Sequence, residues 1–208
     1  MSKRYDQYCP IAHALGLVGE RWSLLIVREL LQGPKRYTDL AASLPGIGTN
    51  ILAARLKELE SCGLVSKRRL DPPAASQVYE LTAYGRELKP VIGALALWGL
   101  RSIDPPTDDA DLAPGWLYGA LDTVFAPAAP AGSFEFRIGG EVAAIVDGEA
   151  RQGSIESPDV VVEAPVNSFY WLVVERRWDG VKLEGDRELL ERLLDAATTP
   201  APAASVLV

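Results

Sequence analysis

The fold is decided by the stretch Thr49-Asn50-Ile51-Leu52-Ala53-Ala54-Arg55-Leu56-Lys57-Glu58-Leu59-Glu60-Ser61-Cys62-Gly63-Leu64-Val65. Three leucines in it recur at helical spacing and predict a helix that buries one face: Leu52, Leu56 and Leu59. Thr49 has a side chain that suits the N-cap of this helix. Gly63 suits the left-handed residue that ends the helix, and a strand is expected to begin directly after it.

A basic two-stranded ribbon is expected to follow this helix. Its first strand runs into Lys67-Arg68-Arg69, and Asp71-Pro72-Pro73 favours a turn. The returning strand is Val78-Tyr79-Glu80-Leu81, after which Thr82 can cap another helix. A helix followed by a basic ribbon is the arrangement of a winged helix-turn-helix, and this indicates a protein that binds DNA.

Apolar residues predict further helices on both sides of this stretch. Thr38 is expected to cap the helix that precedes the decisive one, and Pro45-Gly46-Ile47-Gly48 is the expected turn between them. The apolar faces of the other helices are formed by Ile11, Leu15 and Val18; by Trp22, Leu25, Ile26 and Leu30; and by Leu81, Tyr84, Leu88, Val91, Ile92 and Leu95, in a helix expected to run to about Ser102.

Charge is distributed unevenly along the chain, whose net charge is −7. Residues 1–104 hold fourteen Lys and Arg against ten Asp and Glu, a net of +4. Residues 105–208 hold seven against eighteen, a net of −11. Such asymmetry indicates that the first half, and not the second, meets a polyanion.

The residues expected to contact DNA lie on the outer face of the decisive helix, beside it and on the ribbon. Small side chains on the helix allow close approach to a groove, Asn50 suits a base edge, and the cations suit phosphates. The full set is Arg36, Thr38, Thr49, Asn50, Ala53, Arg55, Lys57, Lys67, Arg68 and Arg69. The alternative is an ordinary helix and hairpin whose charges are simply solvated.

Several spaced segments resemble the HxlR-type winged helix-turn-helix regulators, which are related to the MarR group. They are Tyr8–Leu15, Val18–Leu30, Gly33–Leu40, Leu44–Ile47 and Arg55–Leu59, within about residues 5–100. The resemblance implies a homodimer on a near-palindromic operator. It also implies that the dimer interface uses Leu88, Val91, Ile92, Leu95 and Trp98. This apolar face is also too large to leave in water.

Cys9 stands where this family usually carries a cysteine, which in some relatives senses oxidants or electrophiles. Lys3, Arg4 and the start of a helix lie near it in the sequence and would favour the thiolate. The alternative is a small apolar residue packed at the dimer interface. With only two cysteines, a disulfide framework is not expected.

Three stretches of the second half, Gly132–Val146, Ser157–Val162 and Leu183–Leu194, resemble the sterol-carrier-protein-like fold over about residues 112–197. This fold is an α+β domain with an apolar cavity for lipids or acyl chains. The predicted fold is therefore α+β: a winged helix-turn-helix domain over residues 1–104, a linker over 105–113, a small sterol-carrier-like domain over 114–197, and a tail over 198–208. Strands are expected at Phe134–Ile138, Val142–Val146, Val160–Val162 and Val181–Glu184, and helices at Pro114–Phe125 and Asp186–Ala197.

One segment of this half stays ambiguous, because Phe169–Val174 fits either a buried strand or a helix capped by Asn167. The resemblance favours the helix. Candidate walls of a ligand cavity are Trp116, Phe125, Phe134, Phe136, Phe169, Tyr170 and Trp171, and the alternative, favoured for any one of them taken alone, is a plain core.

The sequence contains no recognisable catalytic constellation, phosphate loop or metal motif, and its single histidine, His13, has no clustered partners. We expect no enzyme activity, no cofactor and no metal. The predicted function is a cytoplasmic, homodimeric transcriptional regulator that binds double-stranded operator DNA, does not use a membrane, and responds to a small apolar ligand. The alternatives are a redox regulator based on Cys9 and a lipid or acyl-chain carrier.

Overall fold

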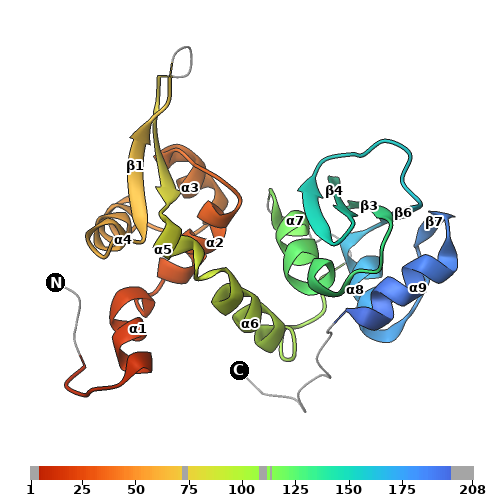
Figure 1. Ribbon diagram of the computed structural model, residues 1–208, viewed down its shortest axis with the longest axis horizontal. Coiled ribbons are helices and arrows are strands. Elements are labelled where there is room, and N and C mark those ends of the chain that lie inside the picture. Colours follow the sequence, from red (N-terminus) through yellow and green to blue (C-terminus); the bar gives the residue numbers. More distant parts are fainter. Residues whose placement is uncertain (1–4, 72–74, 108–111, 113, 198–208) are drawn as a thin grey trace. The chain divides into compact units, whose positions relative to one another are not determined.

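The computed structural model describes residues 5–71, 75–107, 112 and 114–197 (Figure 1). The chain divides into two compact units, residues 1–92 and 93–208, which we call the N-terminal and C-terminal units. The division falls within a helix and therefore precedes the linker expected at residues 105–113. That linker is only partly described, and the tail expected at 198–208 lies outside the described residues.

The N-terminal unit contains helices followed by a hairpin. Along the chain it holds α1 (Pro10–Val18), α2 (Ser23–Leu31), α3 (Tyr37–Ser43), α4 (Thr49–Ser61), β1 (Val65–Arg69), β2 (Gln77–Leu81) and α5 (Ala83–Arg86). Helix α6 (Lys89–Gly99) crosses into the C-terminal unit. The helix expected to follow its cap at Thr82 and to run to about Ser102 is instead two helices, which are separated at Glu87 and Leu88. Leu81, named both for the returning strand and for the apolar face of that helix, ends strand β2.

The core of the N-terminal unit confirms the leucine pattern of α4. Leu52, Leu56 and Leu59 are buried, together with Ile26 of α2 and Leu40 of α3. Burying one leucine side chain stabilises the fold by about 1.5–3 kcal/mol, so this shared core holds the three helices together. Because the leucine face of α4 is held in this core, the opposite face of the helix is directed to solvent.

The predicted helix ends are partly right. Gly63 has φ +73° and ends α4, and Thr82 caps α5 by accepting a hydrogen bond from the Gly85 amide at 3.0 Å. The N-caps predicted at Thr49 and Thr38 are wrong. Thr49 is the first helical residue of α4 after Gly48, and Thr38 lies inside α3, whose cap position is held by Arg36.

The hairpin follows α4 as expected. Strands β1 and β2 pair antiparallel, with Lys67 opposite Tyr79 and Arg69 opposite Gln77. Lys35, which precedes α3, forms an isolated antiparallel bridge with Tyr79 of β2 through two backbone hydrogen bonds of 3.0 and 2.8 Å. The loop between α2 and α3 therefore holds the base of the hairpin. Of the turn predicted at Asp71-Pro72-Pro73, the two prolines lie outside the described residues.

The C-terminal unit is an α+β domain with a five-stranded mixed sheet in the order β5-β4-β3-β6-β7. Strands β3 and β6 are parallel, and the other neighbours are antiparallel. The strands are β3 (Ser133–Ile138), β4 (Glu141–Val146), β5 (Glu149–Gln152), β6 (Val160–Ala164) and β7 (Lys182–Gly185). The helices are α7 (Trp116–Ala120), with a π-helical turn (Leu121–Phe125) and a 3-10 turn (Ala126–Ala128) after it, α8 (Val166–Glu175) and α9 (Arg187–Ala196).

The core of this unit lies on one face of the sheet. Phe134 and Phe136 of β3 pack there with Leu121, with Leu172 of α8 and with Leu190 of α9. The ambiguous segment Phe169–Val174 is helical, although Pro165 and not Asn167 occupies the cap position. Strand β5 was not expected from the sequence.

Candidate DNA-binding surface

The outer face of α4 is formed by residues that point away from its leucines. Thr49, Asn50, Ala53 and Lys57 are all exposed. The hydroxyl group of Tyr37 on α3 donates a hydrogen bond to the Thr49 carbonyl at 2.7 Å, and this contact fixes where α4 begins. The structure thus brings together small, polar and cationic side chains on one rigid helix, as a helix that enters a DNA groove requires.

Sequence reasoning left out one exposed residue of α4, which it assigned neither to the leucine stripe nor to the outer face. Ile51 stands beside the buried Leu52, yet 44% of it is exposed. An exposed isoleucine next to Asn50 can contact the methyl group of a thymine. The signal was available in the helical spacing, since Ile51 falls outside the stripe formed by the leucines.

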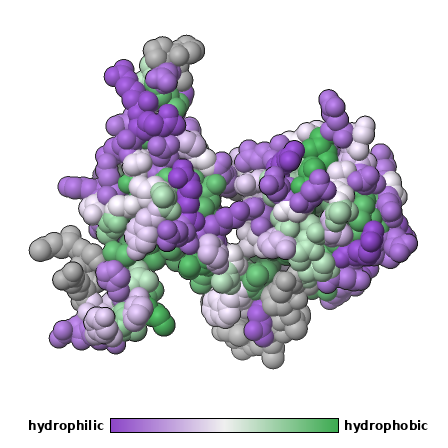
Figure 2. Space-filling view, viewed as in Figure 1, coloured by the Kyte–Doolittle hydropathy of each residue, from purple (hydrophilic) through white to green (hydrophobic). Residues whose placement is uncertain are grey.

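The hairpin carries the other predicted cations. Lys67, Arg68 and Arg69 of β1 are exposed, and Figure 2 shows hydrophilic surface along this hairpin. The Nζ atom of Lys67 also lies 5.5 Å from the centre of the Tyr79 ring on β2. The two strands therefore present a cationic ribbon beside α4, where charge contributes affinity but little sequence information.

Three of the five predicted cations on α4 and the hairpin are ion-paired within the protein. Arg55, with a side chain only 15% exposed, pairs with Glu58 and, at 3.5 Å, with Glu20. The other two pairs are Lys67–Glu60 at 3.0 Å and Arg68–Glu80 at 3.2 Å. The sequence interpretation did not include these carboxylates.

Arg36 and Thr38 are exposed at the beginning of α3. The Arg36 amide donates to Asp39 Oδ2 at 3.0 Å, and the Thr38 hydroxyl group donates to Asp39 Oδ1 at 3.3 Å. Asp39 therefore orders the first turn of α3. This turn precedes α4 in the chain and presents a cation and a hydroxyl group to solvent.

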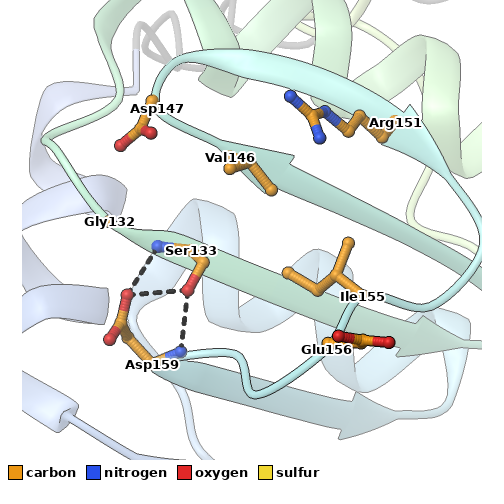
Figure 3. Close-up of a pocket in the computed structure, with 8 residues that line it drawn as sticks. All are labelled: Gly132, Ser133, Val146, Asp147, Arg151, Ile155, Glu156 and Asp159. Carbon is orange, nitrogen blue, oxygen red and sulfur yellow. Dashed lines mark hydrogen bonds between the residues drawn. The ribbon is translucent and has the colours of Figure 1, made fainter.

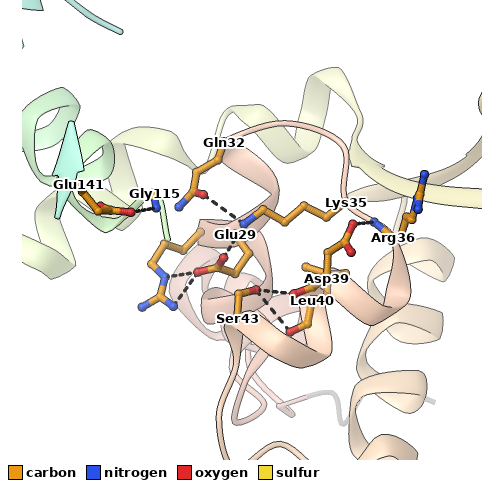
Figure 4. Close-up of polar contacts among 10 residues, drawn as sticks. Glu29, Gln32, Lys35, Arg36, Asp39, Leu40, Ser43, Gly115 and Glu141 are labelled. Atoms are coloured by element: carbon orange, nitrogen blue, oxygen red, sulfur yellow. Dashed lines mark hydrogen bonds and ion pairs between the residues drawn. The ribbon is translucent and has the colours of Figure 1, made fainter. Parts of the chain in front are cut away.

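A buried carboxylate supports the base of the hairpin (Figure 4). Glu29 on α2 accepts hydrogen bonds from Lys35 Nζ at 2.7 Å and from Arg28 Nη2 at 2.7 Å. Burial acts to raise the pKa of Glu29, but the hydrogen bonds and charges of Lys35 and Arg28 together outweigh it and lower the pKa. Glu29 is therefore ionised and holds Lys35, whose backbone pairs with Tyr79 of β2.

Apolar side chains are exposed on α1 and α6. Ile11 and Leu15 of α1 are exposed, and so are Val91, Leu95 and Trp98 of α6, with Trp98 at 70%. Leu88 and Ile92, which were predicted for the same face, are half-buried in the N-terminal core.

Cys9 directly precedes α1 and is a free, half-buried thiol, as is Cys62 at the end of α4. Lys3 and Arg4, which were expected to favour its thiolate, lie outside the described residues.

The aromatic residues proposed as cavity walls in the C-terminal unit fall into two groups. Phe125, Phe136 and Phe169 pack against one another, with ring centres 5.7–6.3 Å apart, and Phe134 is fully buried beside them. Tyr170 and Trp171 of α8 are half-buried, and Trp116 is exposed. The rings of the four phenylalanines thus fill the space between the sheet and the helices.

A polar cavity of about 450 Å³ lies elsewhere in the C-terminal unit (Figure 3). It is bordered by Asp147, in the turn between β4 and β5, and by Arg151 of β5. Ile155 and Glu156 of the loop before β6, and Asp159, also line it. Asp159 Oδ2 accepts hydrogen bonds from both the amide and the hydroxyl group of Ser133, at 2.8 and 2.7 Å. None of the aromatic residues proposed as cavity walls lines this cavity.

The outer face of the sheet carries a second buried carboxylate. Glu135, only 1% exposed, pairs with Arg137 at 2.6 Å and accepts a hydrogen bond from the Ile155 amide at 2.9 Å. Together with the Ser133–Asp159 contacts, it fastens the loop between β5 and β6 onto the sheet. These carboxylates therefore have a structural role that sequence reasoning did not assign to them.

Two further properties concern the described part of the chain only. No helix in it is both long and apolar enough to cross a membrane. No three His, Cys, Asp or Glu side chains within it gather in a way that would hold a metal ion.

Comparison with known proteins identifies the N-terminal half. The model of the HxlR-like helix-turn-helix family matches residues 17–107. An uncharacterized HTH-type transcriptional regulator of Synechocystis sp., sll1512, is 37% identical over 108 residues, which cover 51% of this chain and 79% of the relative. YvaP of Bacillus subtilis, another uncharacterized HTH-type transcriptional regulator, is 38% identical over 102 residues, or 48% of this chain and 94% of the relative.

A solved structure is similar over the same share of the chain. The reduced form of the transcriptional regulator YodB from B. subtilis is 33% identical, with a TM-score of 0.42, and the similarity covers 49% of this chain and 100% of that one. These matches leave the C-terminal unit without an assignment. The family is one of transcriptional regulators and not of enzymes, as the sequence predicts. The chain belongs, through its N-terminal half, to the HxlR-like helix-turn-helix family of transcriptional regulators.

Proposed function

We propose that this protein is a dimeric regulator that binds double-stranded operator DNA in a sequence-selective manner. The observation that carries the proposal is the outer face of α4, where exposed Asn50, Ala53 and Lys57 lie opposite a buried leucine stripe. Helix α4 enters the major groove, and the hairpin β1–β2 follows the phosphate backbone beside it.

The contacts divide by chemistry into base readout and phosphate binding. Asn50 is the residue suited to a bidentate hydrogen bond with adenine, while Thr49 and Ala53 allow close approach to the bases. Lys57 of α4, Arg69 of β1 and Arg36 at the start of α3 are exposed cations suited to phosphates. Thr38 adds a hydroxyl donor next to Arg36, and Arg55, Lys67 and Arg68 contribute once they leave their carboxylate partners.

The dimer would form through the exposed apolar residues of α1 and α6. A twofold axis places two copies of α4 in successive major grooves, about 34 Å apart, and this spacing matches a near-palindromic operator. Leu95 and Trp98 of α6 would then be covered by the partner, and so would Ile11 of α1.

Control by a small apolar ligand in the C-terminal unit is the further part of this proposal, in line with its resemblance to the sterol-carrier-like fold. The rings of Phe125, Phe136 and Phe169 are in mutual contact, so a ligand between them would have to separate them. Native mass spectrometry of the purified full-length protein tests this part, since a retained apolar molecule would support it and an empty protein would count against it. A carrier function without DNA binding would leave the exposed face of α4 without a role.

Selection of duplexes from a random pool by the full-length protein tests the DNA-binding proposal. We expect a near-palindromic consensus that is lost in the Lys57→Glu, Arg68→Glu double variant. The matched control is Arg151→Glu with Lys182→Glu, two exposed cations of the C-terminal unit that give the same change in net charge. If the first variant selected the same consensus as the parent protein, α4 and the hairpin would not be the DNA-binding surface.

A further inference from the structure

Two cations of the hairpin are each held by a carboxylate that belongs to the same surface. Lys67 Nζ lies 3.0 Å from Glu60 Oε2 at the end of α4, and Arg68 Nε lies 3.2 Å from both carboxylate oxygens of Glu80 on β2. Arg69, the next residue along β1, forms no such pair within the described chain, and neither does Lys57 of α4. The hairpin thus carries both paired and unpaired cations.

Both pairs are accessible to solvent and to a competing anion. The side chains of Lys67 and Glu60 are about equally exposed, and Arg68 is more exposed than Glu80. An exposed ion pair is weak, worth about a two- to fivefold change in an equilibrium constant. A DNA phosphate can therefore displace either carboxylate, but at the cost of breaking the pair and of leaving a carboxylate close to a polyanion.

We propose that Glu60 and Glu80 are affinity-limiting residues of the DNA-binding surface, because they hold Lys67 and Arg68 in the free protein and release them only when phosphate binds. The inference rests on the proposed function, since it assigns a role to two carboxylates within the same surface. It concerns the part of the affinity that does not depend on sequence, because the hairpin contributes charge and not base readout.

The consequence for function is a lower affinity for every duplex. Phosphate contacts strengthen binding to every duplex, whereas base contacts on α4 strengthen binding only to the operator. Weakening the phosphate contacts therefore lowers the affinities for operator and for bulk DNA by a similar factor. The ratio between the two affinities is left to the base contacts of α4.

The test measures the affinity of the full-length protein for a duplex of mixed sequence over a range of salt concentrations. Glu60→Gln and Glu80→Gln should each tighten binding by about two- to fivefold at low salt, and the dependence on salt should become steeper because more counterions are released. The matched control is Glu191→Gln, which frees Arg187 of α9 from a pair of 2.9 Å in the C-terminal unit. It changes the net charge equally and should leave the affinity unchanged.

A double-mutant cycle separates release of Lys67 from plain repulsion of DNA by Glu60. In the Lys67→Met background, Glu60→Gln frees no cation, so most of its gain should disappear. An equal gain in both backgrounds, or no gain in the parent protein, would overturn the inference. If the parent protein showed no salt-sensitive binding of any duplex, the proposed function itself would fail, and this result is distinct from the other two.

Discussion

Lys35 Nζ lies 2.7 Å from the carboxylate of Glu29, whose side chain is only 4% exposed. The same lysine pairs through its backbone with Tyr79 of β2. Lys35 thus connects α2 to the base of the hairpin, because its side chain binds Glu29 and its backbone pairs with β2. The position of the hairpin relative to α4, on which simultaneous contact with groove and phosphates depends, is in part fixed by a buried charge.

Replacing Glu29 with alanine should destabilise the protein. The change leaves the partly buried Lys35 ammonium group without its carboxylate partner, although Gln32 Oε1, 3.1 Å away, still accepts a hydrogen bond from it. Loss of a buried charge partner typically costs about 3 kcal/mol of the free energy of unfolding. Urea titration of Glu29→Ala against the parent protein measures this difference. The control is Glu87→Ala, an exposed glutamate of the same unit, which should change the free energy of unfolding by less than about 0.5 kcal/mol.

The stabilisation by Glu29 should depend on pH. Its pKa is lower in the folded protein than in the unfolded chain, so its contribution is present above the unfolded value of about 4.3 and is lost as the pH falls through the folded value. The stability difference between the parent protein and Glu29→Gln should therefore be largest near neutral pH and shrink in acid. A difference that stays constant from neutral pH to pH 3 would contradict this assignment.

Asn50 and Arg69 should contribute to DNA binding in different ways. Asn50→Ala should weaken binding to the selected operator by about 1–3 kcal/mol and relax the preference at one base position. Arg69→Ala should weaken binding to operator and mixed-sequence duplex alike, and lower the salt slope by about one. Titrations of both variants on both duplexes measure the two effects. Equal loss of selectivity in both variants would contradict the division between base readout and phosphate binding.

Leu95→Glu combined with Trp98→Glu should convert the proposed dimer into a monomer, because two buried charges would face the partner subunit. Light scattering during size-exclusion chromatography gives the mass of each variant. Binding of a full operator should weaken together with dimerisation. Tyr84→Glu, at an exposed aromatic residue of α5 outside α1 and α6, serves as the control and should remain dimeric. A double variant that kept the dimer mass would place the interface elsewhere.

Local patterns explain why the decisive helix was predictable. The leucine spacing of α4 and the positive φ of Gly63 depend on residues within a few positions of each other. The N-cap was misplaced by one residue because Thr49 is a good capping residue by type. In the structure, Gly48 is extended, and its carbonyl already accepts the Leu52 amide at 3.0 Å.

Other features depend on contacts that sequence patterns do not encode. Glu60 and Lys67 face each other only because β1 folds back along α4, and Glu80 reaches Arg68 only through the hairpin register. Strand β5 was missed because Glu149-Ala150-Arg151-Gln152 lacks apolar alternation at the edge of its sheet. The aromatic content of the C-terminal unit predicted burial, but could not distinguish a lined cavity from rings in contact.

Salt-dependent titration measures whether the face of α4 and the hairpin bind operator DNA. The measurement compares the affinity of the full-length protein for its selected operator and for a mixed-sequence duplex as salt rises. We expect both affinities to fall linearly in a double-logarithmic plot, with the operator bound at least about a thousandfold more tightly throughout. Equal affinity for the two duplexes, or binding that salt does not affect, would contradict this expectation.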